Sequence, residues 1–209
     1  MEAEFDALVR NDTWTLMELP LDKDVIGTKW IYKIKYKSDG SIDKHKARLV
    51  AKGYAQQEGI DYTETFAPVA KMDTIRTVLV LTAQHGWIIY QMDVKSAFLN
   101  GYVDEEIYVE QPQGFEIAGK ENKVYKLKKA LYGLKQAPRA WYSRIDTYFQ
   151  QKGFQKSSSD PNLYIKVIGS DILIVSLYVD DLIYTGNNHH LLHDFKVDMC
   201  KEFKMTDLG

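Results

Sequence analysis

Residues 177–182 read Leu177-Tyr178-Val179-Asp180-Asp181-Leu182, with two adjacent carboxylates between apolar runs. The first run extends from Ile172 to Val179, and the second from Leu182 to Tyr184. Strand-forming runs on both sides of a two-residue polar break predict a β-hairpin with Asp180 and Asp181 at its tip. Carboxylates held there face outward and are able to bind divalent cations. Asp also tolerates the backbone angles of a tight turn, so ordinary turn chemistry is the alternative interpretation.

The composition is that of a globular protein with a sizeable core. Of 209 residues, 45% are hydrophobic and 12% aromatic, which fits one or two compact lobes. No apolar run approaches the roughly 20 residues needed to span a bilayer, and the N-terminus lacks the regions of a signal peptide. We therefore expect a soluble, unsecreted chain with no membrane partner. The single cysteine, Cys200, excludes an internal disulfide and is expected to pack within a helix.

Charge is segregated along the chain, although the formal net charge is only -2. Eight Lys or Arg and two acids lie between residues 27 and 53, and seven Lys or Arg and no acid lie between residues 123 and 144. Residues 104–121 carry six acids and one lysine. Local fields govern where a phosphate backbone docks, so the basic segments are candidates for nucleic-acid contact.

Residues 29–52 predict a second hairpin, closed by the turn signal Ser38-Asp39-Gly40-Ser41. Its first strand alternates lysines with a row expected to face the core, namely Trp30, Tyr32, Ile34 and Tyr36. The cations at even spacing in its second strand are Lys44, Lys46, Arg48 and Lys52. Two interpretations remain open for these cationic rows: phosphate binding, or a solvated edge hairpin whose lysines discourage aggregation.

A third carboxylate, Asp93, follows a predicted strand at residues 87–92 and precedes a brief helical segment. Such a strand end is a common active-site position, while helix capping is the plainer explanation. If this strand neighbours the one that leads to Asp180 in an antiparallel sheet, the three acids come together. Clustered carboxylates repel one another without a cation. Mg²⁺ uses carboxylates together with substrate phosphates, and two such ions can clamp an in-line phosphoryl transfer.

The remaining pattern predicts helices between these elements. Asp73 is expected to cap a helix that stops at Gly86, and Pro138 to open a helix that ends at Gly153. A further helix is expected between Asn187 and Phe203, with its histidines exposed. No secondary structure is assigned to the five residues from Met205 onward.

The run Tyr178-Val179-Asp180-Asp181 resembles the signature of reverse transcriptases, and the chain as a whole is similar to the polymerase of copia-type retrotransposon polyproteins. The matching stretches, in family order, are Gly27–Trp30, Lys46–Gly53, Phe66–Val69, Gln91–Gly101 and Leu131–Trp141. The resemblance implies an α+β right-hand polymerase fold, in which a palm with an antiparallel sheet packed on helices joins a fingers subdomain. Fingers are expected at about 1–74 and 104–130, and palm at about 75–103 and 131–209, with the family's thumb absent.

The resemblance also implies roles for individual residues. Asp93, Asp180 and Asp181 match the catalytic, metal-binding carboxylates. The residues that match nucleotide contacts are Arg48, Lys35 or Lys37, Phe98, Tyr132 and Gly133. Which of the two lysines contacts the terminal phosphate remains open, and Phe98 is equally compatible with a core position. The basic residues expected to contact nucleic acid are Lys44, Lys46, Lys52 and Lys135.

This sequence differs from that of the retroviral members of the family at one block. Retroviral polymerases usually have Gln-Gly where this chain has Tyr132-Gly133, so Gly133 transfers directly and Tyr132 by position only. The segment Gln111-Pro112-Gln113-Gly114-Phe115 imitates the retroviral block but lies earlier in the chain, and we interpret it as a decoy.

The implied activity is RNA-directed DNA synthesis with two Mg²⁺ ions, or Mn²⁺, from dNTPs on an RNA or DNA template-primer. Its expected partners are the thumb, ribonuclease H and integrase regions of a Pol polyprotein, in a cytoplasmic virus-like particle. Without a thumb, we expect weak activity or none. The alternatives are a catalytically inactive nucleic-acid-binding transposon remnant and an RNA-directed RNA polymerase. Phe98 argues against the second, because its side chain would clash with a 2′-hydroxyl.

Overall fold

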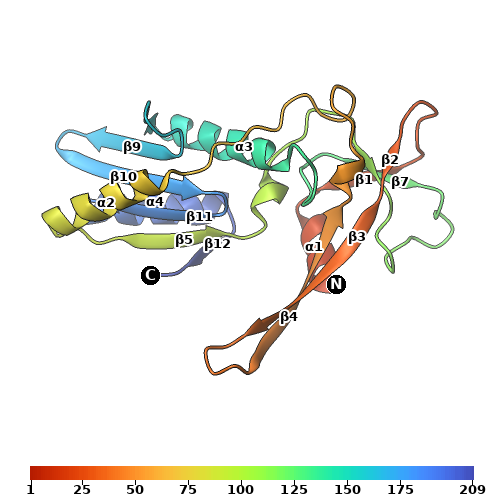
Figure 1. Ribbon diagram of the computed structural model, residues 1–209, viewed down its shortest axis with the longest axis horizontal. Coiled ribbons are helices and arrows are strands. Elements are labelled where there is room, and N and C mark those ends of the chain that lie inside the picture. The colour runs from red at the N-terminus through yellow and green to blue at the C-terminus, as the bar shows by residue number, and fades with distance from the viewer. The chain divides into compact units, whose positions relative to one another are not determined.

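The structure is a computed structural model that describes residues 1–209. Its four α-helices and twelve strands, the latter in three sheets, confirm the expected mixed α/β class (Figure 1). The chain divides into two compact units, each built from two stretches of sequence. Unit 1 comprises Met1–Phe66 and Phe98–Trp141, and unit 2 comprises Ala67–Ala97 and Tyr142–Gly209.

Unit 2 is built on a six-stranded antiparallel sheet of order β12-β5-β11-β10-β9-β8. The strands are β5 (Tyr90–Val94), β8 (Gln155–Lys156), β9 (Leu163–Ile168), β10 (Asp171–Tyr178), β11 (Asp181–Gly186) and β12 (Met205–Asp207). Every residue from Leu173 to Leu177 in β10 is buried. Because successive side chains point to opposite faces of a strand, both faces of β10 are covered.

The predicted hairpin is present, but its tip lies one residue earlier than expected. Tyr178 pairs with Asp181, so the two-residue loop consists of Val179 and Asp180, and Asp181 is the first residue of β11. Val179 has a φ of 56°, whereas the φ of Asp180 is negative. A positive φ at only the first loop residue is the mark of a II′-type hairpin turn rather than I′.

Three helices contribute to unit 2: α2 (Met72–His85), α4 (His189–Glu202) and the later part of α3 (Ala137–Gln151), which begins in unit 1. Aromatic rings join α3 to α4 and to the sheet. The ring of Phe149 lies 4.7 Å from that of Tyr164 and 6.2 Å from that of Phe195. The side chains of α4 and its end that face the sheet are buried, namely Leu192, Phe195, Met199 and Phe203.

The N-terminus of α2 is capped from a distant part of the chain. Asp73, the predicted cap, lies inside the helix, and the residue at the cap position, Lys71, makes no side-chain capping bond. Instead the Lys71 N–H donates to the carboxylate of Asp160 at 3.1 Å. Asp160 is 1% exposed and also accepts the N–H of Asn162 at 2.9 Å. The carbonyl of Asn162 in turn accepts the N–H of Leu177, which links α2 to the strand that ends at the hairpin.

Unit 1 contains a four-stranded sheet of order β1-β7-β6-β2. Its strands are β1 (Trp14–Met17), β2 (Val25–Ile26), β6 (Tyr108–Val109) and β7 (Val124–Leu127), and helix α1 spans Glu2–Arg10. Two short 3₁₀ helices are η1 (Gly53–Ala55) in unit 1 and η2 (Ala97–Asn100), which starts at the last residue of a unit 2 stretch. The core gathers residues from α1, η2 and the four strands of this sheet, and the stacked rings of Trp14 and Tyr125 lie 4.4 Å apart.

A long hairpin of β3 (Thr28–Tyr36) and β4 (Ile42–Ala51) completes unit 1 and extends past α1 (Figure 1). The prediction that one of its faces is core is wrong beyond the base of the hairpin. Trp30 is half-buried and Leu49 buried, whereas every residue from Ile31 to Lys46 is exposed. The register also unites the two cationic rows, because Lys33 pairs with Lys46 and Lys35 with Lys44 on one face.

Two smaller expectations have different outcomes. Cys200 is exposed, so the expectation that it is packed is wrong. His189 and His193 are exposed as expected. None of the helices combines the length and apolar character needed to cross a membrane.

Candidate active site

The sheet of unit 2 brings the three predicted carboxylates onto neighbouring strands. β5 and β11 are antiparallel, and Asp93 lies directly opposite Asp181. Asp180 precedes Asp181 in the loop, and its carbonyl accepts the N–H of Val94 at 2.7 Å. Directly opposed residues share a face, with Cβ atoms about 5 Å apart. The expectation that the strand leading to Asp180 neighbours that of Asp93 is therefore wrong, because β11 lies between β10 and β5, although all three strands belong to one antiparallel sheet.

The carboxylates are half-buried and are not arranged as a closed ligand group. No three His, Cys, Asp or Glu side chains lie close enough together to hold a metal ion. The Oδ1 atom of Asp181 accepts the amide of Gln91 at 3.4 Å, a long bond on the same face as Asp93. Carboxylate oxygens are nevertheless the hard donors that Mg²⁺ prefers, and the shared strand register places them on adjacent positions. The donor chemistry and the backbone placement thus fit a divalent cation.

The hairpin that carries Asp180 contains a strained residue. Val179 has a β-branched side chain, and its φ of 56° lies in a region that such residues rarely adopt. Strain of this kind costs about 1–3 kcal/mol and persists only where surrounding structure enforces it. Here the six paired positions of β10 and β11 enforce it. A fixed turn in turn gives the Asp180 side chain a defined direction.

Sequence reasoning missed one element of this site. β12 pairs with β5 on the side opposite β11, and Thr206 lies opposite Asp93. Backbone bonds extend the ladder beyond β12, since the Gln91 N–H donates to the Gly209 carbonyl and the Leu208 N–H to the Gln91 carbonyl. Asp93 therefore stands on an interior strand. A three-residue strand is too short for a detectable alternation, so the sequence carried no usable signal.

In unit 1, three predicted nucleotide contacts pack together. The Arg48 guanidinium carbon lies 4.6 Å from the centre of the Tyr132 ring. The Phe98 ring packs on the Tyr132 ring, with their centroids 4.5 Å apart. Phe98 is half-buried against the core cluster. Its position is therefore compatible both with a packing role and with the predicted nucleotide contact. The cation–π contact holds the guanidinium in a fixed orientation.

Gly133 is held by backbone packing that only glycine permits. Its φ is +92°, and a Cβ atom would lie 2.2 Å from the Ala51 carbonyl oxygen. A Cβ on Gly53 would lie 1.9 Å from the Gly133 oxygen. The Ala51 N–H also donates to the Tyr132 carbonyl at 2.7 Å. The end of β4 is thus fixed against the 132–133 turn, which orients Tyr132 beneath Arg48.

The predicted basic contacts occupy three environments. Lys35, Lys37, Lys44 and Lys46 are exposed on or beside the hairpin. Lys52 is half-buried and lines a polar cleft of about 440 Å³ together with Glu110 and Glu121. The Lys135 side chain is exposed, while its backbone N–H donates to Gln56. The acidic surroundings of Lys52 make it the least suited of these residues to bind phosphate.

The segment interpreted as a decoy has a structural role. The amide of Gln111 donates to the carbonyls of Lys120 and Lys123, and its oxygen accepts the N–H of Ile117. Phe115 packs on Trp30 at 5.5 Å, and the Gln113 carbonyl accepts the indole N–H of Trp30. This segment therefore supports the base of the β3–β4 hairpin.

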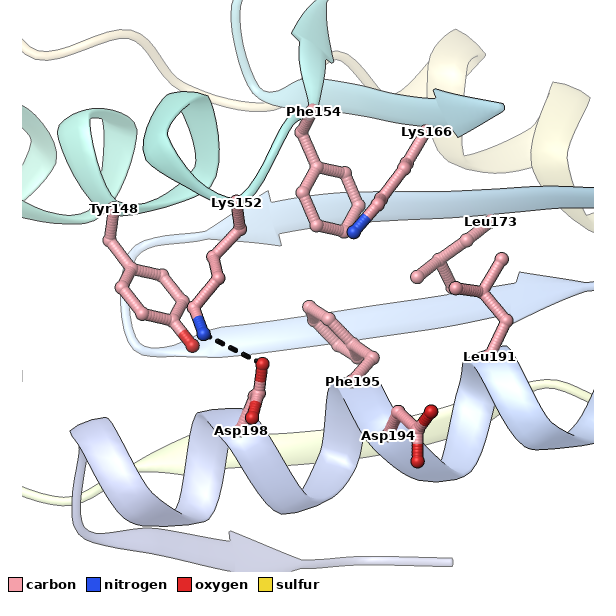
Figure 2. Close-up of a pocket in the computed structure, with 9 residues that line it drawn as sticks. All are labelled: Tyr148, Lys152, Phe154, Lys166, Leu173, Leu191, Asp194, Phe195 and Asp198. Atoms are coloured by element: carbon pink, nitrogen blue, oxygen red, sulfur yellow. Dashed lines mark hydrogen bonds and ion pairs between the residues drawn. The ribbon is translucent and has the colours of Figure 1, made fainter. Parts of the chain in front are cut away.

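A separate cavity of about 50 Å³ lies in unit 2 between α3, α4 and the sheet, and it contains none of the predicted site residues (Figure 2). Phe154, Leu173 and Phe195 form its apolar walls. Lys152 and Asp198 pair at its edge at 2.7 Å. The hydrogen bond from Lys152 lowers the pKa of Asp198, as expected for a carboxyl beside a cation.

Comparison with known proteins defines the class. A family model described as reverse transcriptase (RNA-dependent DNA polymerase) matches residues 11–209. The chain belongs to this reverse transcriptase family, which confirms the resemblance of its sequence motifs.

Individual relatives are transposon polyproteins. The chain is 46% identical over 210 residues to the retrovirus-related Pol polyprotein from transposon TNT 1-94 of Nicotiana tabacum, covering 100% of the chain and 16% of that protein. It is 45% identical over 208 residues to the Pol polyprotein from transposon RE1 of Arabidopsis thaliana, covering 99% and 14%. It is 31% identical over 220 residues to the Transposon Ty1-GR1 Gag-Pol polyprotein of Saccharomyces cerevisiae, covering 99% and 12%. The chain thus spans less than one fifth of each of these polyproteins.

Proposed function

We propose that this chain supplies the fingers and palm of a reverse transcriptase and acts in RNA-directed DNA synthesis. In that reaction the 3′-hydroxyl of a primer attacks the α-phosphate of a dNTP, and pyrophosphate leaves. We assign fingers to about 1–74 and 104–130, and palm to about 75–103 and 131–209. The two compact units support this division in outline, although residues 67–74 belong to unit 2 and residues 98–103 and 131–141 to unit 1.

The single observation that carries the proposal is the pairing of Asp93 with Asp181 beside Asp180. These three side chains would hold two Mg²⁺ ions, with Mn²⁺ as the alternative. Such ions neutralise developing charge on the phosphate oxygens and activate the attacking hydroxyl. The interior position of β5 and the strained turn at Val179 would keep the carboxylates aligned without movement of the backbone.

Unit 1 would contribute the nucleotide contacts. Arg48 and either Lys35 or Lys37 would neutralise the triphosphate, for which guanidinium and ammonium groups are the usual partners. Phe98 would lie beneath the sugar and favour deoxynucleotides, with Tyr132 and Gly133 near the base. The contacts of Tyr132 with the Arg48 guanidinium and with the Phe98 ring support a shared role for these side chains. Lys44, Lys46 and Lys135 would contact the nucleic acid, and Lys52 would be the weakest of these contacts because Glu110 and Glu121 line the same cleft.

The rest of a Pol polyprotein, including thumb, ribonuclease H and integrase, would complete the enzyme in a cytoplasmic particle. We expect the 209-residue chain alone to polymerise weakly or not at all, because a duplex held from one side dissociates quickly. Primer extension on poly(rA)/oligo(dT) with Mg²⁺ measures this directly. Robust processive synthesis by the chain alone would contradict the expectation.

Metal titration separates the enzyme from an inactive nucleic-acid-binding remnant. Calorimetric titration with Mn²⁺ should show binding that Asp180→Asn weakens at least tenfold. Asp194→Asn serves as the control, because Asp194 is an exposed carboxylate of the same unit, on helix α4 and away from the hairpin tip. Unchanged Mn²⁺ affinity in Asp180→Asn, with RNA binding retained, would favour the remnant. In a chain extended through the thumb, preference for rNTPs over dNTPs would instead favour an RNA polymerase.

A further inference from the structure

Two glutamine side chains are buried side by side in unit 1, Gln56 just after η1 and Gln136 just before α3. Gln56 is 7% exposed and Gln136 is 3% exposed. The Nε2 group of Gln56 donates to the Oε1 atom of Gln136 at 3.0 Å, across a sequence separation of 80 residues. Burial of an amide costs free energy unless its donor and its acceptor are both paired. The remaining atoms of the two amides therefore need partners as well.

Those atoms bond to the backbone of two further segments. The Oε1 atom of Gln56 accepts the N–H of Lys135 at 2.8 Å. The Nε2 group of Gln136 donates to the carbonyl of Asp61 at 2.9 Å. The Asp61 carboxylate accepts the N–H of Gln57 at 2.7 Å, which closes this loop on itself. Because each amide donates on one side and accepts on the other, rotation of either amide by half a turn would break two bonds.

The turn over residues 131–137 depends on bonds from other segments. Backbone bonds within the turn are 3.2 and 3.3 Å long, at or beyond the end of the usual range. The bonds from outside are shorter. The Tyr132 carbonyl accepts the N–H of Ala51 at 2.7 Å, and Gln56 accepts the N–H of Lys135 at 2.8 Å. The turn is thus held near its start by the end of β4 and near its end by a buried amide.

The same turn carries side chains that are predicted to contact the nucleotide. The centre of the Tyr132 ring lies 4.6 Å from the guanidinium carbon of Arg48. At Gly53, the first residue of η1, an added Cβ atom would lie 1.9 Å from the Gly133 oxygen and 3.0 Å from the Oε1 atom of Gln56. Gln56 therefore lies where η1 and the turn meet, beside the backbone to which the Tyr132 ring is attached.

We propose that Gln56 and Gln136 are positioning residues, whose paired amides fix the turn so that Tyr132 and Arg48 keep the orientation in which they bind a nucleotide. The inference rests on the proposed function for the identity of that ligand, a deoxynucleoside triphosphate. Methionine is close to glutamine in length and is adaptable in packing, but it cannot donate to Gln136 and is a poor acceptor for a backbone N–H. If the pair served only to fill space, Gln56→Met would be tolerated without effect on the nucleotide.

Amide hydrogen exchange measured by NMR tests the contact with the turn. In Gln56→Met the Lys135 N–H loses its acceptor, so its exchange should accelerate about tenfold relative to the amides of β7 in the same sample. The matched control is Gln111→Met, because Gln111 is a buried amide of the same unit that bonds to the backbone between residues 117 and 123. This control should leave the relative exchange rate at Lys135 within about twofold of that of the wild type.

Titration with dTTP and Mg²⁺, followed through the NMR shift of the Gly133 amide, tests the role in nucleotide binding. Gln56→Met should weaken dTTP binding about fivefold, the loss expected when one neutral hydrogen bond no longer holds the binding groups. Gln136→Met breaks the other half of the pair and should weaken binding as well. Gln111→Met should bind dTTP like the wild type. Circular dichroism of each variant confirms that it is folded.

Three results would overturn the inference. They are unchanged exchange at Lys135 in Gln56→Met, unchanged dTTP affinity in that variant, and an equal loss of affinity in Gln111→Met, since any destabilisation of unit 1 would then have the same effect. None of them concerns the metal site, so Mn²⁺ binding that Asp180→Asn weakens would still support the polymerase. A wild-type chain that does not bind dTTP would instead refute the nucleotide contacts proposed for unit 1, and the positioning role with them.

Discussion

Replacement of Asp160 tests the link between helix α2 and the β10–β11 hairpin most directly. Its carboxylate accepts the backbone N–H groups of Lys71 and Asn162, and a hydrogen bond from Thr74 adds a third donor. Asp160→Ala removes the acceptor of these donors. Asp160 is 1% exposed, so water does not easily replace it. Hydrogen bonds to a charged group contribute about 1.5–3 kcal/mol each. The two backbone bonds alone therefore predict a loss of about 3–6 kcal/mol in the free energy of unfolding.

The control is Asp73, the acid that the sequence suggested as the cap. Asp73 is exposed and pairs only with Arg76 at 3.4 Å on the helix surface. Asp73→Ala should lower the free energy of unfolding by less than about 1 kcal/mol. Urea titration followed by far-UV circular dichroism measures both variants. Equal effects of the two substitutions would refute the capping role of Asp160.

The pH dependence of Asp160 adds a second measurement. Burial opposes ionisation and is the largest single influence, but hydrogen bonds from Thr74 and from the N–H groups of Asn162 and Lys71 outweigh it and lower the pKa of Asp160. A lowered folded-state pKa stabilises the protein above the unfolded pKa of about 3.9, and this contribution is lost as pH falls through the folded value. The stability difference between wild type and Asp160→Asn should therefore be largest near neutral pH and narrow below about pH 4. A difference that stays constant down to about pH 2 would contradict the assignment.

Two further substitutions have defined outcomes. Gly133→Ala should lower the melting temperature by several degrees or prevent folding of unit 1, because its Cβ would lie 2.2 Å from the Ala51 oxygen at a φ of +92°; a differential scanning fluorimetry curve identical to that of the wild type would contradict this. Asn188→Ala should cost about 1 kcal/mol in urea unfolding, because the Asn188 side chain accepts the N–H groups of His190 and Leu191 at the start of α4. Asn188→Ser loses the amide bond to Asp171 as alanine does but keeps a capping oxygen, so it should be more stable than Asn188→Ala; equal losses in both variants would show that capping is not the cause.

The hairpin that carries Asp180 and Asp181 could be predicted because its signals are local. Apolar runs on both sides of Asp180 and Asp181 define two strands, and a two-residue break leaves a tight hairpin as the simple connection. The turn was predicted one residue too late. Val179 is β-branched, and residues of this kind rarely adopt the positive φ that the first loop position requires. Local preference was overridden there by the pairing of Tyr178 with Asp181.

The errors arose where a residue's role depends on distant chain. Alternation assigns Tyr32 and Tyr36 to one face of β3 but does not say whether anything covers that face. Asp73 satisfies the pattern of a helix cap, yet the acceptor that the α2 N-terminus uses is Asp160, far along the sequence. Neither fact has a signature within a short window of sequence.

The position of β12 has a consequence for the order in which this unit can form. β5 is translated more than a hundred residues before Met205–Asp207, the segment that pairs with its outer side. Until those residues leave the ribosome, the strand that carries Asp93 has an open edge, which is a template for unwanted pairing. A contact of such long sequence separation also forms late, because loop closure must precede it. A nascent chain stalled before Met205 is therefore expected to be more prone to aggregation than one that includes Met205–Asp207.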